Sequence, residues 1–195
     1  ADHGAVPVPS YLRDKKLPAA YFDGKAMQEK LNEFVKFTYG TTDLIKNISN
    51  YQIFLDHDII KNLDMDVMKV QESLATEILT YKDIDRVYAA YQMWQNNYTK
   101  GIPYVLQNGY NQKRSGDVLI VLRPDVMDYS ITGSSHGSPQ IYDTHTPFLL
   151  FGKGIKKGST VNRTEIPDIA PTISALLGIS FPSGTTGKPI AEVLR

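Results

Sequence analysis

The chain has 195 residues, of which 42% are hydrophobic and 22% are charged. This balance is typical of a globular domain and excludes intrinsic disorder. Lysine and arginine together number 21, as do aspartate and glutamate, so no net charge would attract nucleic acid or an anionic membrane. No apolar run approaches the roughly 20 residues that span a bilayer. Because cysteine is absent, His, Asp and Glu are the candidate ligands for zinc or a similar ion.

The first half of the chain is expected to be mainly helical. Residues 24–40 predict an amphipathic helix whose apolar positions recur at near-helical spacing and which Gly40 ends. The apolar positions are Met27, Leu31, Phe34, Val35 and Phe37 or Tyr39. The other expected elements of this half are a strand at 51–55, a helical turn at 59–63, and helices at 65–81, 83–96 and 101–110.

The second half of the chain contains apolar segments typical of buried strands. Residues 117–124 predict a strand covered on both faces, because a continuous apolar run lies between turn signals. Residues 132–142 are rich in Gly, Ser and Pro and predict a loop, and 146–151 predict a further strand. A short helix is expected at 168–177, with Ile169, Ile173 and Leu177 facing inward. Alternating helices and apolar strands indicate an α/β sandwich.

Four histidines are the candidate metal ligands. His3 follows Asp2, and adjacent Asp and His can give an oxygen and a nitrogen to one divalent ion where the backbone turns sharply. His136 lies in the Gly/Ser loop, where functional residues are common. His57 and His145 complete the set. Spacing alone does not favour His3 over His57, because a lone histidine is more often a surface or core residue than a ligand.

Two of these histidines have alternative interpretations. Asp56-His57-Asp58 has the composition of a metal-binding triplet, but it falls between a predicted strand and a predicted helix. An Asp at that place is usually a helix N-cap, and we favour the capping interpretation. His145 comes directly before a predicted strand, where it could hydrogen-bond a ligand of a metal site as a partner from outside the coordination sphere.

Several motifs follow one another along the chain in an informative order. They are Ala-Asp-His-Gly at 1–4, Asn-Gly-Tyr-Asn at 108–111, Gly-Ser-Ser-His-Gly-Ser at 133–138 and Tyr-Asp-Thr-His-Thr-Pro at 142–147, followed by a matching tail at 149–155 and 166–178. In this order they resemble the C-terminal part of bacterial alkaline phosphatases. The nearest group is the phosphate-irrepressible, PafA-type branch, which is itself similar to the nucleotide pyrophosphatase/phosphodiesterases.

The resemblance implies the fold. It is an α/β fold, the C-terminal portion of a three-layer sandwich in which a mostly parallel sheet is flanked by helices. Residues 1–195 would form the C-terminal part of one catalytic domain, and residues 24–111 a largely helical subdomain within it. The N-terminal part of the same polypeptide would lie upstream and would be this chain's main partner. A periplasmic or secreted location is expected on the resemblance alone.

The resemblance also implies a site with two Zn²⁺ ions. Asp2 and His3 would hold the ion that coordinates a nucleophilic Thr or Ser, and His136 would hold the ion at the leaving oxygen. His145 matches a family position that is not a ligand, and it stays a candidate for a supporting partner. The nucleophile and the remaining ligands would lie upstream, so the chain itself holds no catalytic nucleophile. We expect it to bind zinc weakly and to be inactive alone.

Three functions are therefore open. The first is hydrolysis of small-molecule phosphate monoesters by a zinc alkaline phosphatase through a phospho-Thr/Ser intermediate. The second is a zinc phosphodiesterase or nucleotide pyrophosphatase of the same superfamily, because the groups that distinguish the two lie upstream. The third is a non-catalytic binding module whose aromatic face would comprise Tyr88, Tyr91, Trp94 and Tyr98.

Overall fold

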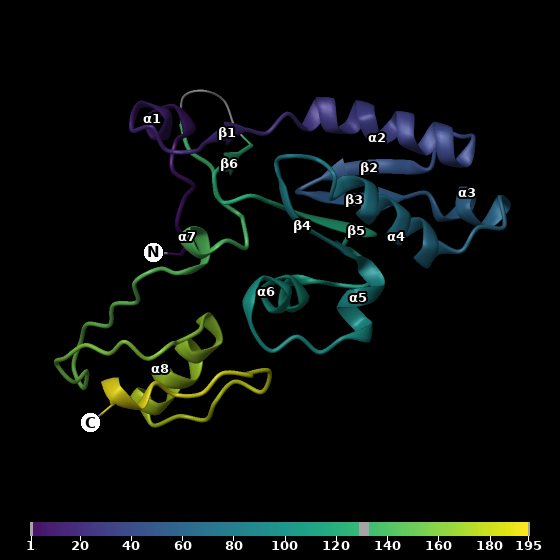
Figure 1. The fold of residues 1–195 in the computed structure, drawn as a ribbon. Coiled ribbons are helices and arrows are strands. Elements are labelled where there is room, and N and C mark those ends of the chain that lie inside the picture. The colour runs from purple at the N-terminus through teal and green to yellow at the C-terminus, as the bar shows by residue number, and fades with distance from the viewer. Residues whose placement is uncertain (1, 129–132, 195) are drawn as a thin grey trace. The chain divides into compact units, whose positions relative to one another are not determined.

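The computed structural model describes residues 2–128 and 133–194, and the chain divides into two compact units, Ala1–Thr146 and Pro147–Arg195 (Figure 1). The first unit contains α1 (Pro9–Asp14), β1 (Ala20–Tyr21), α2 (Gly24–Tyr39), β2 (Ile45–Ser49), β3 (Gln52–Leu55), α3 (His57–Asn62), α4 (Val67–Ile78), β4 (Ile84–Ala89), α5 (Ala90–Gln95), α6 (Gly101–Gly109), β5 (Val118–Leu122), β6 (Val126–Met127) and α7 (Ile141–Thr144). The second unit contains the 3₁₀ helix η1 (Ile166–Asp168), α8 (Ile169–Leu177) and the 3₁₀ helix η2 (Ala191–Val193).

The strands of the first unit form two sheets. The larger sheet has the order β2-β3-β5-β4, and all of its neighbouring strands pair antiparallel. The smaller sheet joins β1 and β6 in parallel, with Ala20 opposite Val126. The predicted α/β fold is confirmed. Within the residues that the structure describes, however, parallel pairing is limited to β1 and β6, so the expected mostly parallel sheet is not formed by this chain's own strands.

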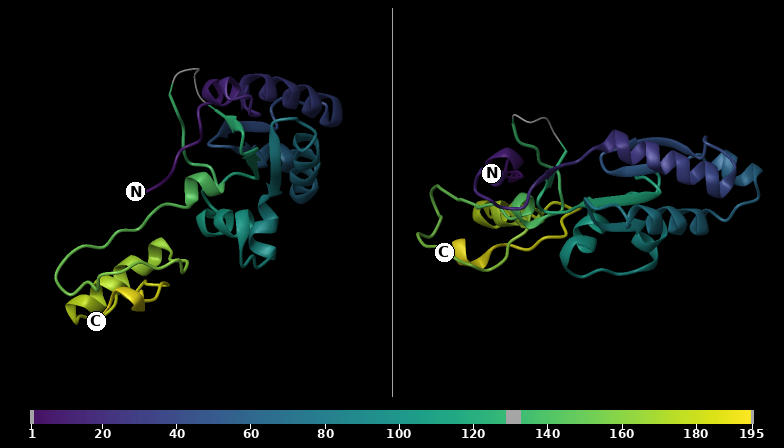
Figure 2. Two further views of the ribbon diagram at one scale, coloured as in Figure 1. Left: turned by 60° about the vertical axis from the view of Figure 1, so that its left-hand side comes forward. Right: turned by 45° about the horizontal axis from the view of Figure 1, so that its top comes forward.

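Helices α2 and α4 pack against the larger sheet and enclose the core (Figures 1 and 2). The helix predicted at 24–40 is confirmed, since the Asp23 side chain accepts a hydrogen bond from the Ala26 amide and Gly40 ends the helix in the left-handed conformation. Leu31 and Val35 are fully buried. Phe37 is 93% exposed and does not belong to the apolar face, because Phe37 lies about 120° around the helix from Leu31, at the centre of that face.

The helix predicted at 83–96 is wrong in its first half. Residues Ile84–Ala89 form β4, and only Ala90–Gln95 form a helix. β4 pairs antiparallel with the fully buried β5, where Val87 lies opposite Ile120. The sheet ladder satisfies the backbone groups of this segment, so tertiary pairing overrides the helical spacing of its apolar residues.

Two expectations for the second half of the chain need correction. The strand expected at 146–151 is absent, and Leu149 and Phe151 are exposed there. Pro147 cannot donate to a ladder, and none of the described strands pairs with this segment. The helix expected at 168–177 is confirmed as α8, but Ile173 and Leu177 are 44% and 66% exposed, so its buried side is not the predicted one.

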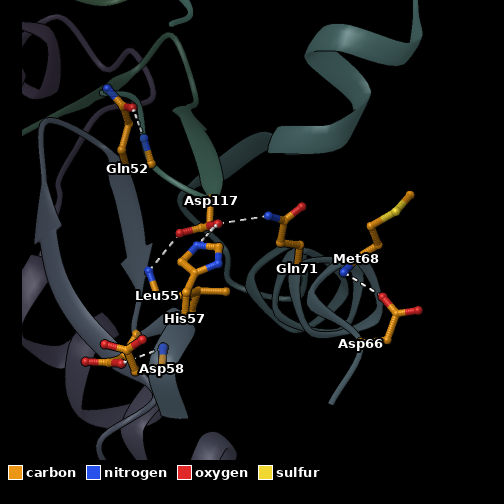
Figure 3. Close-up of polar contacts among 10 residues, drawn as sticks. Gln52, Leu55, His57, Asp58, Asp66, Met68, Gln71 and Asp117 are labelled. Carbon is orange, nitrogen blue, oxygen red and sulfur yellow. Dashed lines mark hydrogen bonds and ion pairs between the residues drawn. The ribbon is translucent and has the colours of Figure 1, made fainter. Parts of the chain in front are cut away.

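Asp117, directly before β5, joins four elements of the first unit (Figure 3). One carboxylate oxygen accepts the Leu55 amide of β3 at 2.9 Å. The other lies 2.9 Å from His57 Nε2 on α3 and accepts a hydrogen bond from Gln71 Nε2 on α4, also at 2.9 Å. Because these donors come from separate elements, one carboxylate fixes how α3 and α4 meet the sheet.

We expect Asp117→Ala to lower the free energy of unfolding by about 2–4 kcal/mol, because the Leu55 amide and the buried Gln71 side chain lose their acceptor. His57→Ala should cost less than about 1 kcal/mol, since the His57 side chain is 57% exposed. Urea unfolding of the two variants and the wild type measures the difference. Equal losses would contradict the central role of the carboxylate.

Candidate metal centre

The first residues of the chain lie beside the 133–143 loop and α7 (Figure 1). The Gly4 amide donates to the Asp143 carbonyl at 2.8 Å, and the Val6 amide donates to the Ser135 carbonyl at 2.9 Å. The Ser134 hydroxyl donates to the Val6 carbonyl at 2.5 Å. These hydrogen bonds bring together two His-Gly motifs that are far apart in the sequence.

Gly4 is required by this close approach. A Cβ atom at this position would lie 1.8 Å from the Tyr142 carbonyl oxygen and 3.2 Å from the Asp143 Cα. Both obstacles are backbone atoms, which cannot rotate away as a side chain can. Any residue with a side chain would therefore push the N-terminal segment away from α7.

The pairing places the imidazoles of His3 and His136 face to face. Their ring centroids are 3.7 Å apart, and their planes differ by 16°. A metal ion lies in the plane of the imidazole that binds it, so two stacked rings with nearly parallel planes cannot both direct a nitrogen to one ion. They can serve two neighbouring ions, and paired catalytic ions lie about 3.5–4 Å apart.

Asp2 and His3 have a geometry suited to a shared ion. His3 Nδ1 lies 2.7 Å from the Gly4 carbonyl oxygen, which makes Nδ1 the protonated nitrogen and Nε2 the nitrogen with a lone pair. Nε2 is 3.7 Å from Asp2 Oδ2. Two ligands of a tetrahedral zinc are about 3.3 Å apart, so a small rotation suffices. A backbone hydrogen bond, and then the neighbouring His3, lower the pKa of Asp2, which favours the ionised ligand form.

The donors in this chain do not complete a coordination sphere. Across residues 2–128 and 133–194, no three His, Asp or Glu side chains converge in a way that would hold an ion. The nitrogen and oxygen donors present suit zinc in their chemistry, but further ligands would have to come from elsewhere. The structure thus places His3 against His136 and Asp2 beside His3, and the role of these three residues as metal ligands stays a prediction.

Two buried polar residues of this region were not anticipated. Asp143 is 3% exposed, and its Oδ2 accepts the Ser138 amide at 2.7 Å. Gln140 is 7% exposed, and its Nε2 donates to the Leu122 carbonyl at the carboxyl end of β5 at 2.9 Å. Asp143 stands within the Tyr-Asp-Thr-His motif, but nothing in its spacing separates it from an ordinary loop carboxylate.

The other two histidines have different surroundings. Asp56 caps α3 by accepting the amides of Asp58 and Ile59 at 3.1 Å, as the capping interpretation predicted. His57 pairs with Asp117 (Figure 3) and does not join the stacked rings. His145 ends α7 with an exposed ring that makes no hydrogen bond to another described residue, and its supporting role stays a prediction.

A small pocket lies against His136. Its lining includes Tyr51, Met127, Asp128, His136 and Tyr142. Burial raises the pKa of Tyr51, and the Asp128 carboxylate, which accepts the Tyr51 hydroxyl, raises it further. Burial also raises the pKa of Tyr142. Both phenols therefore stay protonated under alkaline conditions that would ionise an exposed tyrosine.

Comparison with known proteins gives the class to which this sequence and fold correspond. Alkaline phosphatase PafA of Elizabethkingia meningoseptica is 34% identical over the whole chain. The crystal structure of wild-type alkaline phosphatase PafA superposes with a TM-score of 0.89 over the whole chain at 34% identity. A protein of Myroides odoratus named calcium-transporting ATPase is 38% identical, again over the whole chain. No family model matches the sequence.

The chain thus resembles a C-terminal segment of PafA-type alkaline phosphatases along its entire length, in both sequence and fold. It spans about a third of the proteins it matches, namely 36% of both relatives and 37% of the solved PafA chain. No helix among the residues that the structure describes is long and apolar enough to cross a membrane.

We expect Gly4→Ala to separate the N-terminal segment from the 133–143 loop. The new methyl group would collide with the Tyr142 carbonyl, so the amides of Gly4 and Val6 should lose their acceptors. Hydrogen exchange of the Val6 amide should then rise at least about tenfold, the effect of losing about 1.4 kcal/mol of protection. Gly109→Ala is the control, because a Cβ there meets no atom within 4 Å. Unchanged exchange in Gly4→Ala would contradict the close approach.

The raised pKa of Tyr51 predicts a loss of stability at high pH. In the unfolded chain the phenol ionises near pH 10, whereas the folded chain keeps its proton. Stability from this group is therefore full below about pH 10 and falls as the pH rises further. Above pH 10, Tyr51→Phe should make the unfolding free energy fall less steeply with pH, by at most the slope that corresponds to one proton. Urea unfolding at pH 9 and 11 tests this, and an unchanged slope would contradict it.

Proposed function

We propose that this chain supplies part of a two-zinc site that hydrolyses phosphate monoesters in a longer alkaline phosphatase. The observation that carries the proposal is the stacked pair of His3 and His136, whose nearly parallel rings suit two adjacent ions rather than one. Asp2 beside His3 gives one of these ions a carboxylate ligand. The likeness to PafA-type alkaline phosphatases supports the same chemistry.

The residues of this chain would hold and orient ligands. His3 Nε2 and Asp2 Oδ2 would bind one zinc, while the Gly4 carbonyl fixes the proton on His3 Nδ1. His136 would bind the second zinc. When bound, the two ions would neutralise the attacking and leaving oxygens of an in-line displacement together. The Tyr51 and Tyr142 phenols, neutral because of their raised pKa, would keep added negative charge away from the pocket beside His136.

The nucleophilic Thr or Ser, the other zinc ligands and the groups that bind the phosphoryl oxygens would lie in the part of the longer protein outside this chain. The relatives are almost three times as long as the segment they share with it. The second unit also exposes several large apolar side chains, as expected if more of the fold covers them. Its exposed side chains include Leu149, Phe151, Val161, Leu177, Ile179 and Phe181. A periplasmic or secreted location is part of the same proposal.

The test uses the full-length protein with an aryl phosphate monoester and the matching methyl diester, first loaded with zinc and then treated with a chelator. We expect zinc-dependent turnover with a preference for the monoester. His136→Ala should lower turnover at least about 100-fold, because a zinc ligand is lost. His57→Ala is the matched control and should stay near wild type, since His57 contacts Asp117 instead.

Each outcome has a definite meaning. A preference for the diester would assign the protein to the phosphodiesterase branch with the same metal residues. Turnover that survives both the chelator and His136→Ala would overturn the zinc site. If neither ester is hydrolysed, only the likeness of fold to the alkaline phosphatases would remain, and the binding-module hypothesis would be favoured.

A further inference from the structure

We propose that Asp143 is a positioning residue that holds both ligand-bearing segments of the site in register. The inference rests on the proposed zinc site, because Asp143 would set the distance between His3 and His136 in that site. Asp143 binds no ion in this scheme. It acts through the backbone on either side of the stacked rings.

Asp143 contacts both segments at once. Its Oδ2 accepts the amide of Ser138, two residues after His136, at 2.7 Å. Its main-chain carbonyl accepts the amide of Gly4, the residue after His3, at 2.8 Å. One residue therefore accepts a hydrogen bond from the backbone near each imidazole.

The anchor is itself firmly held. Asp143 is 3% exposed, and its amide donates to the Gln140 carbonyl at 3.0 Å. Gln140 in turn donates through its buried side chain to the Leu122 carbonyl at the end of β5. A continuous series of hydrogen bonds thus runs from the larger sheet through α7 to the segments that carry His3 and His136.

The chemistry of the side chain favours a carboxylate here. An ionised oxygen accepts an amide hydrogen bond more strongly than a neutral one. Asn would keep a weaker acceptor of the same size, and Ala would leave the Ser138 amide without a partner. The main-chain bond to Gly4 does not depend directly on the side chain, so a substitution should loosen the His136 loop before it loosens the N-terminal segment.

The experiment compares the wild type, Asp143→Ala, Asp143→Asn and Asp117→Ala in the full-length protein. Asp117→Ala is the control, because it removes a largely buried, multiply bonded carboxylate away from the stacked rings. Zinc affinity is measured by competition with a chelator, and hydrogen exchange of residues 134–138 is measured in the metal-free protein.

We expect Asp143→Ala to raise exchange at 134–138 and to weaken zinc binding about 10- to 100-fold, the range for residues that orient metal ligands. Asp143→Asn should restore part of the zinc affinity and part of the protection from exchange, whereas a protein that had lost its fold would recover neither. Asp117→Ala should destabilise the protein yet keep wild-type zinc affinity.

Three results would overturn the inference. Wild-type zinc affinity and exchange in Asp143→Ala would show that Asp143 does not position the ligands, and the proposed function would stand. A wild-type protein that binds no zinc would remove the proposed function together with this inference. If Asp143→Ala does not fold, Asp143→Asn takes its place in the test. A folded Asp143→Asn protein with raised exchange at 134–138 but wild-type zinc affinity would also contradict the positioning role of Asp143.

Discussion

The close pairing of residues 2–6 with the 134–143 segment is the constraint on which the candidate site depends. It has two requirements: a glycine at position 4, where a side chain would collide with the Tyr142 carbonyl, and a buried acceptor, Asp143, on the facing segment. Without this pairing, His3 and His136 would be isolated surface histidines. With it, they stack at 3.7 Å.

The stack has a further consequence for the chemistry. Two rings with nearly parallel planes exclude a single shared ion and favour a pair of ions, which is the arrangement suited to displacement at phosphorus. The same stack supplies too few donors for either ion. In the proposed function a longer protein would complete the coordination, and the match of this chain to 37% of the solved PafA chain is in keeping with that proposal.

The first unit provides the rigid support that such a site needs. Asp117 fixes α3 and α4 on the larger sheet, and Gln140 ties α7 to the end of β5 in that sheet. Each of these contacts uses a largely or fully buried polar side chain whose partners come from separate elements. Such side chains specify one arrangement of the elements, because any other arrangement would leave a buried polar group unpaired.

Local features could be predicted from the sequence alone. The period of apolar residues and Gly40 were enough for α2, the unbroken apolar run for β5, and the Asp residues of the 56–58 triplet for a capped helix start near α3, because each depends on neighbours close in the chain. Tertiary structure decided the rest. Residues 84–89 became a strand because β5 offered a partner, and the 146–151 segment stayed irregular in the absence of one. Residue spacing did not favour His3 over His57 as a metal ligand, and it did not indicate Asp143 as a site residue. The motif order favoured His3 through the family resemblance, and the folded chain added the contact of Gly4 with Asp143, because contacts between distant residues leave no periodic signal in a single sequence.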